Sequence, residues 1–428
     1  MSNYNINTKC IQSGYEPKNG EARVLPIYQS TTFKYDTAAE LGDLFDLKSN
    51  GFFYSRLANP TVDAVEKKIT DLEGGVGSVL TSSGQSAVFY SIFNICHAGS
   101  HIICSNAVYG GTFNLFNKTL REMGIETTFV PADASEDDLH AAFKSNTRCV
   151  FGEVLTNPSL SVLDIEMYAR VAHAHHVPLI VDNTFPTPVN CRPFEFGADI
   201  VVHSTSKYMD GHACVLGGVV IDSGNFDWNN GLFLGLTIPD ESYHGIIYTD
   251  TFGKAAYIIK MRVHLMRDFG AMASPNSAFL LNLGLETLFL RVERHCQNGL
   301  AVANHLVNHP KISWINYPGL KGNKNYELAQ KYLPNGTSGV ISFGVCGGRD
   351  ASIKFMEALK LAKIVIHVAD ARTSVVHPAS TTHRQLSDAQ LLEAGVSADL
   401  IRMSVGIEHI DDIIRDIDQA LEQVQNVY

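Results

Sequence analysis

Short apolar runs of β-forming residues alternate with helical stretches between about residues 77 and 221 of this chain. The runs occupy residues 77–81, 101–105, 125–130, 148–155, 177–184, 199–204 and 215–220. Strands that are apolar along their whole length and are separated by helices are typical of a mostly parallel sheet covered by helices on both faces. The alternation therefore predicts one large α/β domain with seven strands.

The pattern changes after about residue 275. A long helical region is expected over 277–306, a helix over 352–361, and strands at 339–345, 363–368, 373–378 and 400–407. The last stretch has apolar residues at 410, 413, 414, 417, 421 and 424, which is a helical stripe. We therefore expect an N-terminal arm (1–60), which fits neither pattern, the α/β domain (61–275) and a smaller C-terminal α+β domain (276–428).

Composition excludes several classes of partner. The net charge of -11 without a basic tract argues against nucleic acid or an anionic membrane. The first 25 residues do not resemble a signal peptide, and the apolar segment 279–290 is too short to span a bilayer. The eight cysteines form no CxxC pair, which favours reduced thiols in a cytoplasmic enzyme. Without HExxH or a Cys/His array, no metal site is expected.

Polar groups follow the predicted strands where each strand ends. In an open parallel sheet, ligands bind at the carboxyl ends of the strands. The first strand leads into SSGQSA, a turn that contains Ser83, Gly84 and Gln85 and that presents free backbone N–H groups suited to a phosphate. The later strands are followed by Tyr109, Asn157, Asp182, Ser204, Ser206 and Lys207.

Together these groups fit one cofactor. A desolvated lysine such as Lys207 can form a Schiff base with an aldehyde. A carboxylate such as Asp182 can keep a pyridine nitrogen protonated, so that the ring accepts electrons. Tyr109 can stack on that ring, while Ser204, Ser206 and the glycine turn hold a phosphate. The set predicts pyridoxal phosphate.

Each signal has a more ordinary explanation when it stands alone. The lysine can belong to a capped loop, Asp182 can be a helix N-cap, and Ser-Gly turns are common. Neither GxGxxG opening a helix after a strand nor GxxxxGK[ST] occurs, which weakens dinucleotide-binding and P-loop interpretations. The alternative from another class is a nucleotide-binding α/β protein without a covalent cofactor, in which Lys207 only contacts a phosphate.

Several motifs carry a resemblance to a known family. They are YSRLANPT (54–61), SSGQSA (82–87), VYGGT, TNPS, VDNTF, HSTSKY, HPASTTH (377–383) and IRMSVGIE (401–408). The chain resembles, nearly end to end, the cysteine and methionine metabolism family of pyridoxal-phosphate enzymes, which implies the fold of type I pyridoxal-phosphate transferases. Within the family, segments 235–258 and 377–386 are similar to O-acetylhomoserine sulfhydrylases of methionine biosynthesis and transsulfuration. Methionine γ-lyase and cystathionine γ-synthase are the alternatives.

The resemblance implies a role for each matching residue. Lys207 would bind the cofactor covalently and move protons, and Tyr109 would stack on the ring, both as catalytic residues. Asp182 would face the ring nitrogen and Asn157 would lie beside the cofactor. The phosphate would be held by Ser83, Gly84, Gln85, Ser204 and Ser206. Tyr54 and Arg56 would reach the phosphate from a neighbouring subunit of a homotetramer, with Tyr54 and Arg402 contacting the substrate, the latter at its carboxylate.

Two positions bear on the choice of reaction. Gly111 stands where methionine γ-lyases of this family carry a cysteine, which favours synthesis of homocysteine over its breakdown. His367 stands where the resemblance leads us to expect asparagine in the sulfhydrylases or serine in the lyases. His367 either faces the substrate or is a hydrogen-bonded core histidine. The identity of the thiol donor and of the leaving group stays open at this point.

Overall fold

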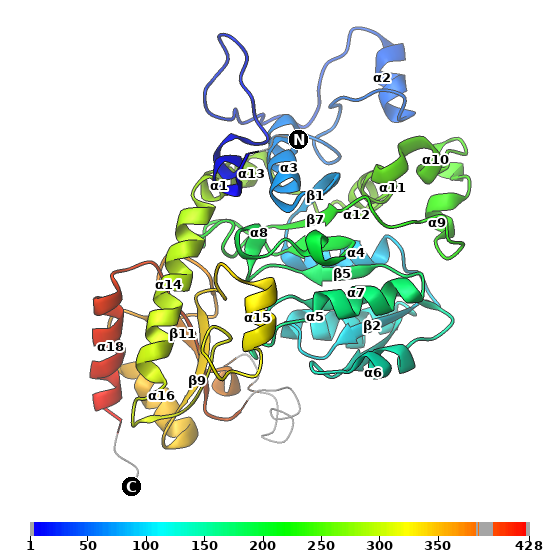
Figure 1. Cartoon of the computed structure of the whole chain (residues 1–428). Coiled ribbons are helices and arrows are strands. Elements are labelled where there is room, and N and C mark those ends of the chain that lie inside the picture. The colour runs from blue at the N-terminus through cyan, green and yellow to red at the C-terminus, as the bar shows by residue number, and fades with distance from the viewer. Residues whose placement is uncertain (1–3, 382–383, 385–396, 425–428) are drawn as a thin grey trace.

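The computed structural model describes residues 4–381, 384 and 397–424, and the strands among them form two sheets. The larger sheet has seven strands in the order β1-β7-β6-β5-β4-β2-β3. These strands are β1 (Gly77–Thr81), β2 (His101–Ser105), β3 (Glu126–Val130), β4 (Thr147–Glu153), β5 (Leu179–Asp182), β6 (Ile200–His203) and β7 (Gly218–Asp222). Figure 1 shows this sheet beside a smaller unit that carries the C-terminus.

Most neighbouring strands of the larger sheet run parallel. The strands from β3 through β2, β4 and β5 to β6 are parallel, while β7 is antiparallel to both β6 and β1. The predicted large, mostly parallel seven-stranded sheet is therefore confirmed. Its strands differ from the predicted runs by a few residues at their ends.

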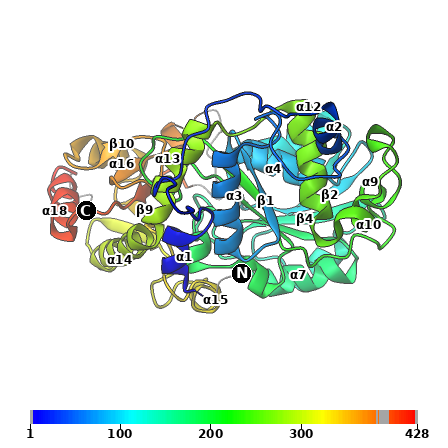
Figure 2. The same cartoon turned by 90° about the horizontal axis from the view of Figure 1, so that it is seen from above.

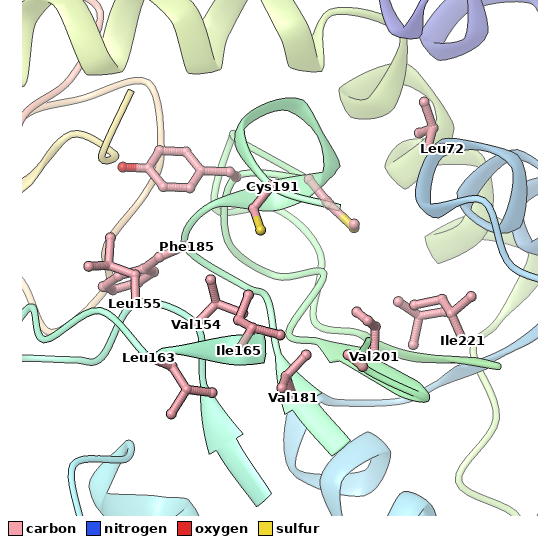
Figure 3. Packing of buried hydrophobic residues seen from close by; sticks show 14 of the residues in the cluster. Leu72, Val154, Leu155, Leu163, Ile165, Val181, Phe185, Cys191, Val201 and Ile221 are labelled. Atoms are coloured by element: carbon pink, nitrogen blue, oxygen red, sulfur yellow. The ribbon is translucent and has the colours of Figure 1, made fainter. Parts of the chain in front are cut away.

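Side chains of the sheet alternate between two buried clusters. In β6, Val201 belongs to one cluster, and Ile200 and Val202 belong to the other. Successive side chains of a strand point to opposite faces, so both faces of this sheet are covered. Figure 3 shows the first cluster, in which Val201 and Val181 of neighbouring strands lie together. Burial on both faces explains why inner strands such as β6 are apolar along most of their length.

Local signals set the ends of the helices around this sheet. Helix α3 (Pro60–Glu73) starts where the Asn59 side chain accepts the N–H of Thr61, and it stops at Gly74 with a φ of 80°. Helix α4 (Gly84–Phe93) starts with Ser83, whose hydroxyl accepts the N–H of Ser86 at 3.1 Å. Polar oxygens at N-caps and left-handed glycines at helix C-termini satisfy the free backbone groups there.

The smaller sheet has five strands in the order β10-β11-β12-β9-β8. They are β8 (Ile312–Asn316), β9 (Val340–Val345), β10 (Lys363–Ile364), β11 (Ser374–Val376) and β12 (Leu400–Ser404). Strand β8 was not predicted, and the run expected over 363–368 is a strand at only its first two residues. The helices α16 (Gly348–Ala358) and α18 (Ile410–Glu422) pack on this sheet with α14 (Leu288–Leu306).

The long helical region expected over 277–306 consists of two helices. Helix α13 (Pro275–Glu286) ends at Thr287, and α14 begins at the next residue. Part of segment 377–386, used above for the resemblance, lies outside the described residues. Among the helices that the structure describes, none has both the length and the apolar content needed to cross a bilayer.

The first part of the N-terminal segment packs on its own chain, and the part that follows is exposed. Helix α1 (Ile6–Gln12) packs against α3, and Lys9 forms an ion pair of 2.9 Å with Asp71 of that helix. The following segment, with α2 (Ala38–Phe45), extends away from the smaller sheet at the top of Figure 1, and Figure 2 shows it from above. Exposed apolar side chains lie along this segment: Val24, Ile27, Tyr28, Phe45 and Tyr54.

Candidate active site

The carboxyl ends of β4, β5 and β6 bring polar side chains to one edge of the larger sheet. Glu153 pairs in register with Asp182, and Asp182 pairs with Val202 on the next strand. The loops that leave this edge carry Asn157 after β4 and Ser204 to Lys207 after β6. Three of the predicted strand ends are therefore neighbours in the sheet.

The glycine turn before α4 packs directly against the loop after β6. A Cβ atom on Gly84 would lie 2.6 Å from the Cβ atom of Ser204, so only glycine fits at this helix start. The hydroxyl of Ser83 caps the helix, and Ser206 exchanges hydrogen bonds with the backbone of Gly217 at 3.0 and 3.2 Å. The close approach leaves a helix N-terminus beside serine side chains, which is an arrangement suited to a phosphate.

Lys207 lies at this edge in a largely desolvated position. Burial, with a smaller contribution from nearby Arg402, lowers the pKa of its amine to about 8. Its Nζ atom is 3.4 Å from Nδ1 of His367. A lysine with such a pKa is mostly protonated at pH 7, but its neutral form is far more abundant than in an ordinary lysine and can act as a nucleophile or base.

Asp182 accepts the backbone N–H of Thr184 at 2.9 Å. Burial raises the pKa of its carboxyl, whereas hydrogen bonds from Thr184 and the nearby His203 lower it. His203 is fully buried, and its Nε2 atom is 2.6 Å from Oε1 of Glu73, which is also buried. A positively charged ring nitrogen beside Asp182 would stabilise its ionised form.

Tyr109 projects from the loop after β2, and its side chain is 53% exposed. Its backbone N–H donates to Oε1 of Glu153, and Gln85 donates to the carbonyl of Gly111 at 2.8 Å. A Cβ atom on Gly111 would lie 2.5 Å from Cε1 of the Tyr109 ring. The ring thus lies against a position that must stay small, next to the glycine turn.

Arg402 of β12 reaches the candidate site from the smaller sheet. Its Nη1 donates to Oδ1 of Asn157 at 3.0 Å and its Nη2 to the carbonyl of Ile366 at 2.9 Å. Its buried Nε has no hydrogen-bond partner among the described residues. Burial lowers the pKa of Arg402 to about 10, so the guanidinium remains charged near neutral pH. A buried charge with a free N–H is suited to a carboxylate ligand.

His367 lies beside Lys207, on the segment that precedes β11. Burial and the neighbouring lysine both lower the pKa of its imidazole, so the neutral form predominates near neutral pH. Its Nε2 is buried and has no hydrogen-bond partner in the described part of the chain. The contact with Lys207 connects His367 to the site, and its contact with substrate stays a prediction.

Tyr54 and Arg56 are not brought to this edge by their own chain. The Arg56 guanidinium lies over the Tyr54 ring, with its carbon 5.1 Å from the ring centroid, and Tyr54 is 40% exposed. None of the hydrogen bonds and ion pairs among the described residues joins either side chain to Lys207. Their predicted contact with a partner subunit's cofactor therefore stays a prediction.

Glu153 was missed by the sequence reasoning. It is only 5% exposed, and its two oxygens accept the backbone N–H groups of Tyr109 and Asn157. The signal was present, since a glutamate inside the apolar run 148–155 is unusual for a buried strand.

A separate cavity of about 260 Å³ lies at the opposite edge of the sheet, lined by residues of segments 143–147, 175–177 and 230–232. Of the two histidines that line it, His175 already hydrogen-bonds His140 at 2.9 Å. No cluster of three or more metal-ligating side chains occurs within the described ranges. The carboxyl edge around Lys207 is thus the stronger candidate site.

The residues at that edge fit pyridoxal phosphate. The fit rests on the close packing of Gly84 on Ser204, on the desolvated amine of Lys207, and on the free Nε of Arg402. These features supply a phosphate cradle, a nucleophile for an aldehyde and a site for an amino-acid carboxylate.

Known proteins resemble the chain over nearly its full length. The family model described as "Cys/Met metabolism PLP-dependent enzyme" matches residues 7–422. The homocysteine synthase of Schizosaccharomyces pombe is 47% identical over 96% of this chain and 97% of its own length. The O-acetyl-L-homoserine sulfhydrylase of Leptospira meyeri is 42% identical over 99% of this chain and 98% of its own. A Campylobacter jejuni structure, assigned as an O-acetylhomoserine (thiol)-lyase and carrying pyridoxyl phosphate on a lysine, has a TM-score of 0.94 at 36% identity, covering 98% and 100% of the two chains.

Proposed function

Because the chain belongs to the Cys/Met metabolism family of pyridoxal-phosphate-dependent enzymes, we propose that it converts O-acetyl-L-homoserine and sulfide to L-homocysteine and acetate, in methionine biosynthesis. The family predicted from the motifs is confirmed by the match over residues 7–422. The same family match shows that the alternative of a nucleotide-binding protein without a covalent cofactor is wrong. The observation that carries the proposal is the buried amine of Lys207 at an edge that also offers a phosphate cradle and Arg402.

The cofactor would be held by groups from several strand ends. Lys207 would bind its aldehyde, Asp182 would keep its ring nitrogen protonated, and Tyr109 would lie on the ring face. The turn at Gly84 and the serines after β6 would hold the phosphate. When bound, pyridoxal phosphate supplies a ring that withdraws electrons from the carbons of an attached amino acid.

Lys207 would then move the protons of the reaction. Its lowered pKa makes the neutral amine more abundant near neutral pH than in an ordinary lysine, and this neutral amine can take a proton from the α-carbon and then help to take one from the β-carbon. Acetate leaves from the γ-carbon and sulfide adds there. Return of the protons by Lys207 completes the exchange and releases homocysteine.

Two side chains would orient the reacting groups. Arg402 would bind the substrate carboxylate through its free Nε and through N–H groups now bound to Asn157 and Ile366. Nδ1 of neutral His367, 3.4 Å away, would accept a hydrogen bond from Lys207 and so direct the amine. Neutral imidazole is a poor general acid, which favours capture by sulfide over protonation and breakdown of the substrate.

The assembly that we propose is a homotetramer built from dimers with shared sites, in the cytoplasm. Several large apolar side chains of the N-terminal segment are exposed, and their number on one segment supports a partner contact there. The eight free cysteines, all of them among the described residues, fit a reducing compartment.

Product analysis tests the proposed reaction. The purified protein with O-acetylhomoserine and sulfide should form homocysteine and acetate in equal amounts. Lys207→Ala should lose the visible absorption band of the lysine-bound cofactor and reduce turnover by roughly a hundredfold or more. Lys260→Met is a matched control, since Lys260 is buried with a pKa also lowered to about 8 but binds the carbonyl of Asn94, away from the site. A Lys207→Ala protein with near-native turnover would contradict the proposal.

A further inference from the structure

One carboxylate holds two loops of the site. Glu153 is the last residue of β4, and its Oε1 accepts the backbone N–H of Tyr109, which follows β2. Its Oε2 accepts the backbone N–H of Asn157, at 3.3 Å, in the loop that follows β4. The side chain of Asn157 in turn accepts a hydrogen bond from Arg402 at 3.0 Å. Glu153 therefore connects the predicted stacking ring with the predicted carboxylate-binding group.

We propose that Glu153 is a positioning residue of this active site, which fixes the Tyr109 ring over the cofactor and holds Asn157 so that Arg402 is correctly placed. It acts through these two loops and does not touch the substrate. The inference rests on the proposed function, because it assigns Tyr109 and Arg402 the contacts described there.

Glutamine could not accept both backbone N–H groups that Glu153 accepts. Two N–H groups point at it, and a glutamine of the same size offers one acceptor oxygen and one N–H₂ donor. One of the loops would then face a donor instead of an acceptor. An unsatisfied buried N–H group is costly, so that loop is expected to shift or open.

Burying the carboxyl group of Glu153 next to another carboxyl group destabilises the fold electrostatically. Glu153 and Asp182 are paired in register on adjacent strands, and neither forms an ion pair with lysine or arginine in the described part of the chain. Burial and the nearby Asp182 raise the pKa of Glu153, whereas the backbone N–H groups of Tyr109 and Asn157 lower it by stabilising the ionised form. Cys104 of β2 is also close, and His203 faces Asp182 from β6. Unpaired buried carboxyls weaken a fold, and they cluster at sites that use them.

The experiment compares Glu153→Gln with Asp222→Asn in the cofactor-loaded protein. Asp222 is a matched control because it is a buried carboxyl of the same sheet, at the end of β7, and accepts one backbone N–H, that of Gly224 at 2.8 Å. Hydrogen exchange of peptides covering 105–112 and 154–160 reports the two loops directly. Four further quantities are measured: the Michaelis constant for O-acetylhomoserine, the turnover number, the circular dichroism of the cofactor band and the thermal unfolding midpoint.

For Glu153→Gln we expect amide exchange to rise about tenfold in at least one of the two loops. The Michaelis constant should also rise about tenfold, with a weaker cofactor dichroism. The unfolding midpoint should change little, because removing an unpaired buried carboxyl offsets the unsatisfied N–H group. Asp222→Asn should leave exchange of the two loops, dichroism and Michaelis constant unchanged. Unchanged exchange and Michaelis constant in folded Glu153→Gln would overturn the proposal. A lower unfolding midpoint with faster exchange throughout the chain would also overturn it, since that marks a purely structural role.

If Glu153→Gln does not fold, Glu153→Asp goes through the same measurements. Aspartate keeps both acceptor oxygens on a shorter side chain, so faster exchange confined to the two loops supports the proposal, and unchanged exchange overturns it. Failure of the proposed function is distinguishable: a wild-type protein that makes no homocysteine refutes that reaction, while loop exchange still tests the role of Glu153.

Discussion

At the scale of single residues, the guanidinium of Arg402 is the group whose surroundings most directly predict substrate binding. It is 8% exposed and charged, and Asn157 and Ile366 occupy two of its N–H groups. We expect Arg402→Ala to weaken binding of O-acetylhomoserine by about 2 to 5 kcal/mol, because a buried carboxylate loses its charge-assisted contact. Substrate titration of the cofactor spectrum measures this loss, with exposed Arg415→Ala as control. Loss of the cofactor with unchanged substrate affinity would place Arg402 in another site.

His367 bears on the partition between synthesis and breakdown. Its pKa is lowered by burial and by Lys207, so its protonated, acidic form declines as pH rises toward neutral. We therefore expect homocysteine to exceed 2-oxobutyrate from O-acetylhomoserine and sulfide at pH 7 to 8, both in the parent and in His367→Asn. Quantifying both products over a pH series tests this. A keto acid that increases at low pH and disappears in His367→Asn would make the histidine an acid.

The residues that sequence reasoning found share one property, which is a place at the end of an apolar strand. Lys207, Asp182 and Asn157 could be grouped from sequence because parallel strands end at one edge. Glu153 lies at the same edge but was missed, since its role depends on the backbone N–H of Tyr109, which is 44 residues away in the sequence. Tyr54 and Arg56 were predicted as site residues only from the family resemblance. The structure of a single chain does not test their predicted contact with a partner subunit's cofactor.

At the scale of elements, the strands that are buried on both faces were the easiest to predict from the sequence. The inner strands of the larger sheet are buried on both faces and read as nearly continuous apolar runs, whereas the edge strand β3 is largely half-buried. Strand β8 is only half-buried or exposed along its length, so its residues ISWIN mix polar and apolar types and give a weak signal. The break between α13 and α14 falls at Thr287, without a glycine or proline to announce it.

The pH dependence of stability can be predicted for β7. Burial raises the pKa of Asp222 to about 7, above its value of about 3.9 in an unfolded chain. A raised carboxyl pKa destabilises the folded state increasingly as pH rises from 4 to 7, by up to about 4 kcal/mol. Asp222→Asn removes that cost but buries an N–H₂ group, which costs about 1 to 3 kcal/mol.

We therefore expect Asp222→Asn to gain about 1 to 3 kcal/mol of unfolding free energy at pH 8. Near pH 4 it should be about 1 to 3 kcal/mol less stable than the parent, because only the cost of the buried N–H₂ group remains there. Denaturant unfolding of parent and variant at both pH values measures the difference. An equal effect at the two pH values would show that Asp222 is not the titrating group.

At the scale of the whole molecule, the site lies where the two sheets meet. The loop after β4 contacts the smaller sheet through Asn157, which binds Arg402 of β12, and through the carbonyl of Pro158, which accepts from Ser342 of β9 at 2.8 Å. Ligand sites are frequent at such junctions, because groups from separate units converge there. The cofactor would contact the larger sheet and the substrate carboxylate the smaller one.

The N-terminal segment gives the last prediction, which concerns the number of chains in one site. Tyr54 and Arg56 lie together on an exposed segment and make no hydrogen bond or ion pair to Lys207 among the described residues. If each site combines Lys207 of one chain with Arg56 of its partner, a hybrid of Arg56→Ala and Lys207→Ala chains contains one intact and one doubly altered site. Random mixing in equal amounts should then restore about a quarter of the native activity, since half of the dimers are hybrids. Native mass spectrometry of differently tagged chains verifies that hybrids form, and each variant re-mixed with itself is the control. No recovery in verified hybrids would mean that both residues serve the same chain's site.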